Sequence, residues 1–308
     1  MIRNPRSAFT VPRDEPGVLT EKLPLVSILT PSFNQAAFLP DNLRSVECQT
    51  YARVEHIVMD GSSTDGSVEI LQDAGDSVRW RSEPDEGQAD AVNKAFRESQ
   101  GEMIGWLNSD DAYFGCRVIE DVVAYFLSHP DVDVVYGHCL QITGDGRAIQ
   151  VLWAPRFDRE LQKAVNLQMQ PSTFLRRRAL SDPLLDASFH FAVDYELWLR
   201  LASQGRRFGR MDRILSIDRH QLERKSATIK DVNFADLERL RPMYDLHLGS
   251  EFNRQRSMFY RRQRLMGALF IPTIHTDKVT FTPSANLKTG LWRRQVGSRR
   301  TNWPDEFK

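Results

Sequence analysis

Glu102-Met-Ile-Gly-Trp-Leu-Asn-Ser-Asp-Asp111 is the stretch that decides the fold. Its apolar first half is a short hydrophobic run of the kind found in parallel strands that are covered on both faces. Its second half ends in two adjacent carboxylates, Asp110 and Asp111. Ligands of open α/β sheets bind outside the carboxyl ends of the strands, and Mg²⁺ is held by one or two carboxylates together with substrate phosphates. The stretch therefore points to a metal-bound nucleotide, or alternatively to Asn108, Ser109 and Asp110 as caps of the next helix.

The composition of the chain indicates a globular protein of enzyme size. Its 308 residues are 41% hydrophobic, which is enough for one large domain with a substantial core. The 41 basic and 41 acidic side chains balance, so the global charge gives no reason to expect a nucleic-acid partner. Cys48, Cys116 and Cys139 are far apart and show no paired metal-ligand spacing, which predicts reduced, packed thiols. Since neither a long apolar run nor an apolar signal segment occurs in the sequence, a cytoplasmic location is expected.

Strand and helix patterns alternate along the first part of the chain. The expected strands lie at 25–30, 54–60, 78–83 and 102–107, and the expected helices at 40–49, 67–72, 88–99 and 117–127. Further strands are expected at 132–136, 148–152, 169–175 and 214–217, and further helices at 157–165 and 191–201. This order predicts an α/β fold with a mainly parallel, doubly wound sheet that carries helices on both faces.

The two ends of the chain differ from the middle. Residues 1–23 contain prolines and show little periodicity, which predicts a loosely ordered lead-in to a catalytic domain at 24–232. From 233 to 308, arginines alternate with apolar residues, which predicts a helical, amphipathic and basic C-terminal extension. Such a stretch is usually a solvated helix face packed on the main domain, and the alternative is peripheral contact with an anionic membrane.

Two charged residues of the expected helix at 88–99 admit two interpretations. Asp90 and Lys94 share one face at i,i+4, with the acid in the first turn, where the helix dipole favours it. They form either a surface ion pair worth a few tenths of a kcal/mol, or a site where Lys94 and the positive helix N-terminus face phosphate. Both interpretations remain open from the sequence.

Two further residues follow or begin expected elements. Asp194 stands where the helix at 191–201 begins, either as a cap or as an acid at the mouth of a pocket with Tyr195 and Trp198 as its aromatic wall. His220 follows the last expected strand in Asp218-Arg-His220, where it is either structural or a ligand.

The order of these segments resembles the family-2 glycosyltransferases, which have the Rossmann-like nucleotide-sugar transferase fold called GT-A. The resemblance extends over roughly residues 25–222 and is carried by the segments 26–34, 58–66, 83–94, 106–111 and 193–200. The resemblance implies nucleotide binding by Thr30, Pro31, Ser32, Asn34, Asp60, Ser62, Asp85, Gln88, Asp90, Lys94, Asn108, Ser109, Asp110 and Asp111. It also implies Mn²⁺ or Mg²⁺ held by Asp110, Asp111 and His220, with Asp194 as the general base.

The chain departs from the family pattern at two positions. Asn108 replaces the first acid of the Asp-x-Asp motif, and Val193 replaces the first acid of the pair before the last helix, which leaves Glu196 as the fallback base. A catalytically silent nucleotide-sugar or carbohydrate-binding module is therefore an alternative. A nucleotidyltransferase is disfavoured, because Thr30-Pro-Ser-Phe-Asn34 lacks the Gly-rich basic loop of that class.

The resemblance implies an activity as well as a fold. It implies inverting, metal-assisted transfer of one sugar from a nucleotide-diphosphate sugar, expected to be UDP-linked, to a hydroxyl of a glycan or lipid-linked acceptor. The sequence contains no Gln-x-x-Arg-Trp segment of the kind found in processive polysaccharide synthases, which favours single-sugar addition. Such a reaction would serve polysaccharide biosynthesis for the cell envelope, at the inner face of a membrane.

Overall fold

The first four strands form the parallel half of one sheet in the computed structural model, which describes residues 23–220, 230–246, 250–275 and 278–283. They lie in the order β3-β2-β1-β4, and each neighbouring pair is parallel. Their bounds are β1 (Val26–Ser32), β2 (Val54–Asp60), β3 (Arg79–Ser82) and β4 (Met103–Trp106). The helices between them are α1 (Leu39–Glu47), α2 (Ser67–Asp73) and α3 (Gln88–Glu98), with the short η2 (Gly75–Ser77) before β3.

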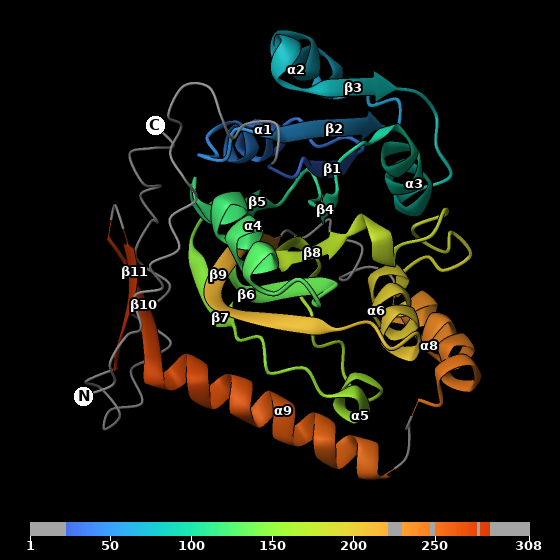
Figure 1. Ribbon diagram of the computed structural model, residues 1–308, viewed down its shortest axis with the longest axis vertical. Coiled ribbons are helices and arrows are strands. Elements are labelled where there is room, and N and C mark those ends of the chain that lie inside the picture. The colour runs from blue at the N-terminus through green and yellow to red at the C-terminus, as the bar shows by residue number, and fades with distance from the viewer. Residues whose placement is uncertain (1–22, 221–229, 247–249, 276–277, 284–308) are drawn as a thin grey trace.

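The other half of the sheet is mixed. It contains β5 (Ala112–Tyr113), β6 (Val134–Thr143), β7 (Ala148–Leu152), β8 (Thr173–Arg176) and β9 (Phe208–His220). β8 is antiparallel to both β4 and β6, β7 is antiparallel to β6, and β5 is antiparallel to β9, whereas β6 and β9 are parallel. The predicted α/β class is confirmed, and the sheet is mixed but mostly parallel, because its antiparallel pairs all involve strands that follow β4. Figure 1 shows the strands stacked from β3 at the top to β7 and β9 lower down.

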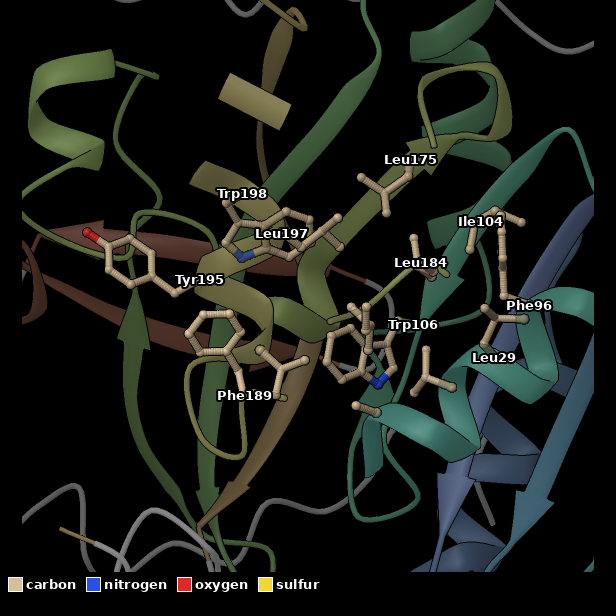
Figure 2. Close-up of a cluster of buried hydrophobic side chains, with 14 of the residues drawn as sticks. Leu29, Phe96, Ile104, Trp106, Leu175, Leu184, Phe189, Tyr195, Leu197 and Trp198 are labelled. Atoms are coloured by element: carbon tan, nitrogen blue, oxygen red, sulfur yellow. The ribbon is translucent and has the colours of Figure 1, made fainter. Parts of the chain in front are cut away.

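Helices cover both faces of the sheet, as a doubly wound fold requires. α4 (Val118–Ser128) packs with α1 on one face, where alternate strand residues such as Ile28 and Met103 point. α3 and α6 (Val193–Ser203) cover the other face, where Leu29 and Ile104 point. Figure 2 shows side chains of the second cluster gathering from strands and helices, among them Trp106 and Trp198. Because side chains alternate along a strand, one run of apolar residues supplies both cores.

The remaining elements follow the sheet or connect its later strands. They are α5 (Arg159–Gln162), η3 (Gln170–Ser172), η4 (Arg177–Ala179), α8 (Lys230–Tyr244), α9 (Ser250–Leu269), β10 (Phe270–His275) and β11 (Lys278–Pro283). α8 runs across the expected domain boundary at 232/233, and its Leu240 is buried in the same cluster as α6. α9 runs along the bottom of Figure 1 and touches β7 through Gln263, whose Oε1 accepts from the Trp153 backbone N–H at 2.9 Å. Among the described residues, no helix has the length and apolar composition needed to cross a membrane.

Two of the three cysteines form a disulfide. Cys48 follows the last turn of α1 and pairs with Cys116 in the turn before α4, while Cys139 is a buried free thiol. The prediction of three reduced thiols is therefore wrong for Cys48 and Cys116. The prediction rested on their separation of 68 residues in the sequence. In the structure, α1 lies against the turn before α4, and the two Cα atoms are 5.1 Å apart. The cysteines thus no longer support the expectation of a reducing compartment.

Candidate active site

The turns after β1 and β2 interlock at one edge of the sheet. β1 and β2 are in register from Val26↔Val54 to Ser32↔Asp60, so the two chains leave the sheet together. The Asn34 N–H donates to Ser63 Oγ at 2.7 Å, and the Thr64 N–H donates to Asn34 Oδ1 at 2.9 Å. Asn34 and Ser62 both have positive φ values, 53° and 63°, a conformation that favours asparagine and glycine. The predicted nucleotide residues of these two turns are thus brought together.

Asp60 is engaged within its own turn. Its side chain is buried and accepts hydrogen bonds from Ser63 N (2.9 Å), Ser63 Oγ (2.5 Å) and Ser82 Oγ (2.7 Å). The neighbouring Thr30 is buried, and its Oγ1 lies 2.9 Å from His56 Nε2. Pro31 and Ser32 are also buried at the end of β1. These contacts show that Asp60 and Thr30 shape the turns from inside.

An exposed aromatic ring lies beside this edge, and sequence reasoning missed it. Phe33 is 59% exposed, which is unusual for a large apolar side chain next to buried residues. A Cβ on Gly61 would lie 2.7 Å from Asp85 Oδ2 and 3.3 Å from the Phe33 ring. Phe33, Gly61 and Asp85 therefore converge around one small space. The sequence signal that could have identified Phe33 is a large aromatic residue in an otherwise polar turn after a buried strand.

Lys94 closes the loop before α3. Its Nζ lies 3.1 Å from Asp90 Oδ2 and 3.2 Å from Glu83 Oε1, and it donates to the Pro84 carbonyl at 3.1 Å. Burial alone would lower the pKa of Lys94, but the bonds to Asp90 and Glu83 outweigh it and raise that pKa. With two carboxylates and a carbonyl around one ammonium group, the geometry favours the ion-pair interpretation over phosphate binding.

Asn108 is the centre of a side-chain network at the end of β4. Its Oδ1 accepts from Gln88 Nε2 (2.7 Å) and Trp106 Nε1 (2.9 Å), and its Nδ2 donates to Gln170 Oε1 (3.1 Å). Gln170 in turn donates through Nε2 to the Trp106 carbonyl. An aspartate at 108 would therefore place an oxygen against Gln170 Oε1. The network explains why an amide stands where the family motif has an acid, and Gln170 is a site residue that the sequence did not reveal.

Asp110 and Asp111 lie in a turn held between α1 and β9. The chain enters β5 at Ala112 and the next helix begins only at Val118, so the interpretation of 108–110 as helix caps is wrong. Asn42 Nδ2 donates to the carbonyls of Asn108 (2.8 Å) and Asp111 (3.1 Å). The turn that carries the two carboxylates is thus fixed by α1.

Arg219 fixes the same turn from the side of β9. Its backbone N–H donates to Asp111 Oδ1 and its Nε to the Asp110 carbonyl, both at 3.2 Å, while its Nη2 pairs with Asp41 at 2.7 Å. His220 is the last residue of β9 and directly follows Arg219, whose backbone N–H bonds to Asp111. Two of the three predicted metal ligands, Asp110 and Asp111, therefore lie together in this turn.

The donor set fits a cation only in part. In the described part of the chain, no group of three or more His, Cys, Asp or Glu side chains is placed to hold a metal ion. Asp110 and Asp111 supply adjacent carboxylates, the ligand type that Mg²⁺ and Mn²⁺ prefer. These residues therefore fit a cation that is shared with the phosphates of a substrate, and they do not form a cage of protein ligands alone.

Asp194 stands in the first turn of α6 but does not cap it. The N-cap is Ala192, and the carboxylate of Asp236 on α8 accepts from the backbone N–H groups of His190, Phe191 and Ala192 at 2.7–3.0 Å. The cap interpretation of Asp194 is therefore wrong, and the sequence did not reveal Asp236. Asp194 instead accepts from the Tyr195 N–H (2.7 Å, Oδ1) and Asn166 Nδ2 (3.0 Å, Oδ2).

The expected aromatic wall behind Asp194 is core. Trp198 is 1% exposed and belongs to the cluster between the sheet and α6 (Figure 2). The Tyr195 hydroxyl points away from that cluster and donates to the Gln162 carbonyl at 2.6 Å. Burial, followed by the Asp194 carboxylate, raises the pKa of Tyr195. Both rings therefore support the helix that carries Asp194, and the expectation that they line a pocket is not met.

Glu196, the fallback base, is occupied by structural partners. It is 2% exposed and accepts from Arg200 Nε at 3.0 Å and from the Tyr244 hydroxyl at 2.6 Å. The first bond lies within α6, and the second joins α6 to α8. Of the two acids on this helix, Asp194 is the one that lies outside such an ion pair with Arg200.

Comparisons with known proteins agree with this arrangement. Residues 27–193, more than half of the chain, match the model of the family described as "Glycosyl transferase family 2". An uncharacterized glycosyltransferase of Mycobacterium tuberculosis is 35% identical over 116 residues, 37% of this chain and 44% of that protein. A PGL/p-HBAD biosynthesis glycosyltransferase of the same species is 30% identical over 139 residues, 44% of this chain and 52% of that protein. The chain thus spans about half the length of these curated relatives.

Solved structures share the fold at low sequence identity. Residues 1–349 of Staphylococcus aureus TarS in complex with UDP-GlcNAc superpose with a TM-score of 0.57 at 18% identity, covering 77% of this chain and 72% of that one. A mannosyltransferase from Pyrobaculum calidifontis, in complex with GDP-Man and Mn²⁺, gives a TM-score of 0.51 at 18% identity, covering 63% and 56%. With the family model matched over most of the sheet and the fold shared with these transferases, the chain belongs to glycosyl transferase family 2.

Proposed function

We propose that the protein transfers a single sugar from a nucleotide-diphosphate sugar to an acceptor hydroxyl, with inversion at the anomeric carbon. The observation that carries this proposal is the difference between the two acids of α6. Glu196 is buried in an ion pair with Arg200, whereas Asp194 lies at the start of the helix with N–H donors on both of its oxygens. A single general base is what an inverting displacement needs.

The donor nucleotide is proposed to bind at the ends of β1, β2 and β4. Phe33 offers an exposed ring on which a base can stack, a contact worth about 1–3 kcal/mol per base. Asp85 lies directly beside it, against Gly61. The turns that contain Asn34 and Ser62 border the same edge. A UDP-linked sugar is the preferred donor in this proposal, supported by the UDP-GlcNAc complex of the TarS structure.

A divalent cation is proposed at the diphosphate. Asp110 and Asp111 would hold Mn²⁺ or Mg²⁺ together with the donor phosphates, and His220, which directly follows Arg219 at the end of β9, is proposed as a further ligand. When bound, the cation neutralises charge that develops on the departing diphosphate. The Mn²⁺ in the Pyrobaculum mannosyltransferase complex supports this choice of metal.

The chain's own groups then account for the displacement. Asp194 takes the proton of the acceptor hydroxyl while that oxygen attacks the anomeric carbon, and the bond from this carbon to the diphosphate oxygen breaks. Arg219 and Asn42 keep the Asp110 turn in place during the reaction. A glycosidase would need two opposed carboxyl groups and no nucleotide, and Glu196, the other acid of α6, is bonded to Arg200 and Tyr244.

A panel of nucleotide sugars tests the proposal. UDP-, GDP- and other nucleotide sugars are screened by thermal shift with and without Mn²⁺, because a bound donor raises the melting temperature by mass action. We expect a Mn²⁺-dependent shift for a UDP-sugar and release of UDP when saccharide acceptors are added. Binding without turnover across an acceptor array would support the silent-module alternative, and no binding of any donor would contradict the proposal.

The acceptor is proposed to be a glycan or lipid-linked sugar near an anionic membrane. Arg254, Met258, Arg261 and Leu265 of α9 are exposed at i, i+4, i+7 and i+11 and so share one face. Each arginine near an anionic leaflet contributes about 1 kcal/mol. The fraction of protein that sediments with anionic vesicles should fall as the salt concentration rises. It should also be lower for an Arg254→Gln/Arg261→Gln variant. Equal recovery in the supernatant with neutral and anionic vesicles at low salt would leave only the packed-helix interpretation.

A further inference from the structure

Asn166 projects toward α6 from a segment that is buried on both sides of it. Its neighbours Val165 and Leu167 are 6% and 1% exposed and pack, with Ala164, in a small apolar cluster. Because both neighbours point into that cluster, the side chain between them turns to α6, where Nδ2 donates to Asp194 Oδ2 at 3.0 Å. The reversed amide would set two oxygens against each other, so the donor must face the carboxylate.

The other end of the Asn166 amide has no structural use. Among the described residues, Asn166 Oδ1 is buried without a hydrogen-bond partner. A buried unpaired acceptor costs stability, typically about 1–3 kcal/mol. An asparagine that served the fold alone would be expected to use both ends of its amide, as Asn93 does with the N–H and carbonyl of Leu185. The contact with Asp194 is therefore the feature that accounts for an amide at this position.

The backbone around Asn166 is anchored at both ends. The Tyr195 hydroxyl donates to the Gln162 carbonyl at 2.6 Å on one side. On the other side, Gln170 is bonded to Asn108 and to the Trp106 carbonyl. Residues 162–170 thus form a short bridge from the helix that carries Asp194 to the end of β4, and a side chain on this bridge holds its partner at a fixed place.

We propose that Asn166 is a positioning residue, whose side-chain amide holds the Asp194 carboxylate in the orientation in which it accepts the proton of the acceptor hydroxyl. The inference rests on the proposed role of Asp194 as the base. Arg256 and Tyr260 of α9 act electrostatically on the Tyr195 hydroxyl, as Asp194 does, so both are charged or titratable groups near this corner. Both remain unchanged in every variant compared below.

A titration of Asp194 in the full chain tests the contact directly. The protein is labelled with aspartate carrying ¹³C in the carboxyl group, and the signal of Asp194 is identified by its loss in Asp194→Asn. Removing the donor in Asn166→Ala should raise the midpoint of this signal by about one pH unit, because a hydrogen bond to the ionised form is lost. Asn166→Asp should raise it further, because two carboxylates about 3 Å apart do not both ionise readily.

Asn93→Ala is the matched control, since Asn93 is buried and uses both ends of its amide on Leu185 instead of Asp194. It should lower the melting temperature more than Asn166→Ala does, and it should leave the Asp194 midpoint where the wild type has it. A midpoint that is unchanged in both Asn166 variants would overturn the inference. So would a midpoint that moves equally in Asn93→Ala, because the shift would then report general loosening.

Turnover separates this inference from the proposed function. Release of UDP from UDP-GlcNAc and of GDP from GDP-mannose is followed with a saccharide acceptor array. Asn166→Ala should lower kcat about tenfold with little change in donor KM. Normal turnover in Asp194→Asn would refute the base role itself. An inactive Asp194→Asn alongside wild-type kcat and midpoint in both Asn166 variants would refute the positioning role alone.

Discussion

The proposed donor side and the proposed acceptor side of the candidate site are built in different ways. The donor side is formed where parallel strands end, and its turns interlock between consecutive strand and helix units, as in the bond from Asn34 to Ser63. The proposed acceptor side is formed around α6, where Asn166 reaches Asp194 and where Asp236 of α8 bonds to the backbone just before the helix, 44–46 residues away in the sequence. The first arrangement follows from the order of strands, whereas the second depends on packing between distant segments.

The largest expected effect separates the two acids of α6. Asp194→Asn should cut turnover by a factor of about 10² or more while donor binding stays nearly intact, because the amide keeps the shape but cannot take a proton. Donor affinity by calorimetry and initial rates of diphosphate release measure the two quantities.

Glu196→Gln provides the comparison on the same helix. It weakens the pairing with Arg200, so it should lower the melting temperature while turnover per folded molecule stays close to the wild type. If Glu196→Gln were inactive and Asp194→Asn active, the assignment of the base would be reversed.

On the donor side, Asp110→Ala should weaken Mn²⁺-dependent binding of a nucleoside diphosphate by about 10–100-fold, the usual range for losing a group that supports a metal site. Asp73→Ala, at an exposed position at the end of α2, is the control and should bind as the wild type does. Calorimetry of UDP with and without Mn²⁺ decides the point. Unchanged affinity in the presence of Mn²⁺ would remove Asp110 from the proposed metal site.

Asn108 tests the hydrogen-bond network that connects the end of β4 to Gln170. Asn108→Asp should lower the free energy of unfolding by about 1–3 kcal/mol, because an oxygen would replace the N–H that faces Gln170. Asn34→Asp is the same chemical change in an exposed turn where the Oδ1 acceptor role is kept, so it should cost less than about 0.5 kcal/mol. Equal losses in denaturant unfolding would show that the network does not require an amide.

The last pair of predictions concerns two buried histidines of the sheet, His56 on β2 and His138 on β6. Burial lowers the pKa of His56 to about 3. As pH falls below about 6.5, the unfolded chain gains a proton that the folded chain does not, so stability falls by up to about 1.4 kcal/mol per pH unit. His56→Gln should remove this slope between pH 6.5 and 5 in denaturant unfolding.

His138 on β6 should contribute a smaller slope of stability against pH. Burial lowers its pKa, but the hydrogen bond and the charge of Asp212 oppose that shift. His138→Gln should therefore change the pH dependence of unfolding less than His56→Gln does. The reverse order would mean that Asp212 does not compensate the buried ring.

The features that depend on strand order could be predicted from the sequence, whereas those that depend on packing between distant segments could not. The buried strand that precedes Asp110 and Asp111 could be predicted, because apolar runs and strand order are local signals. The amide at 108 could be noticed but not explained, since its partner Gln170 lies 62 residues away. The Cys48–Cys116 pair and the bonds of Asp236 to the backbone before α6 were missed for the same reason. Trp198 was misplaced because helical spacing cannot tell a pocket wall from a core contact.

The central claim is a single displacement with Asp194 as the base, and the anomeric configuration of the first product tests it most directly. Proton NMR of the product, recorded before mutarotation or further reaction, gives the configuration from the coupling of the anomeric proton. One displacement inverts the carbon that is attacked, so the product should have the configuration opposite to that of the donor sugar. Retention of the donor configuration would contradict both the single displacement and the role given to Asp194.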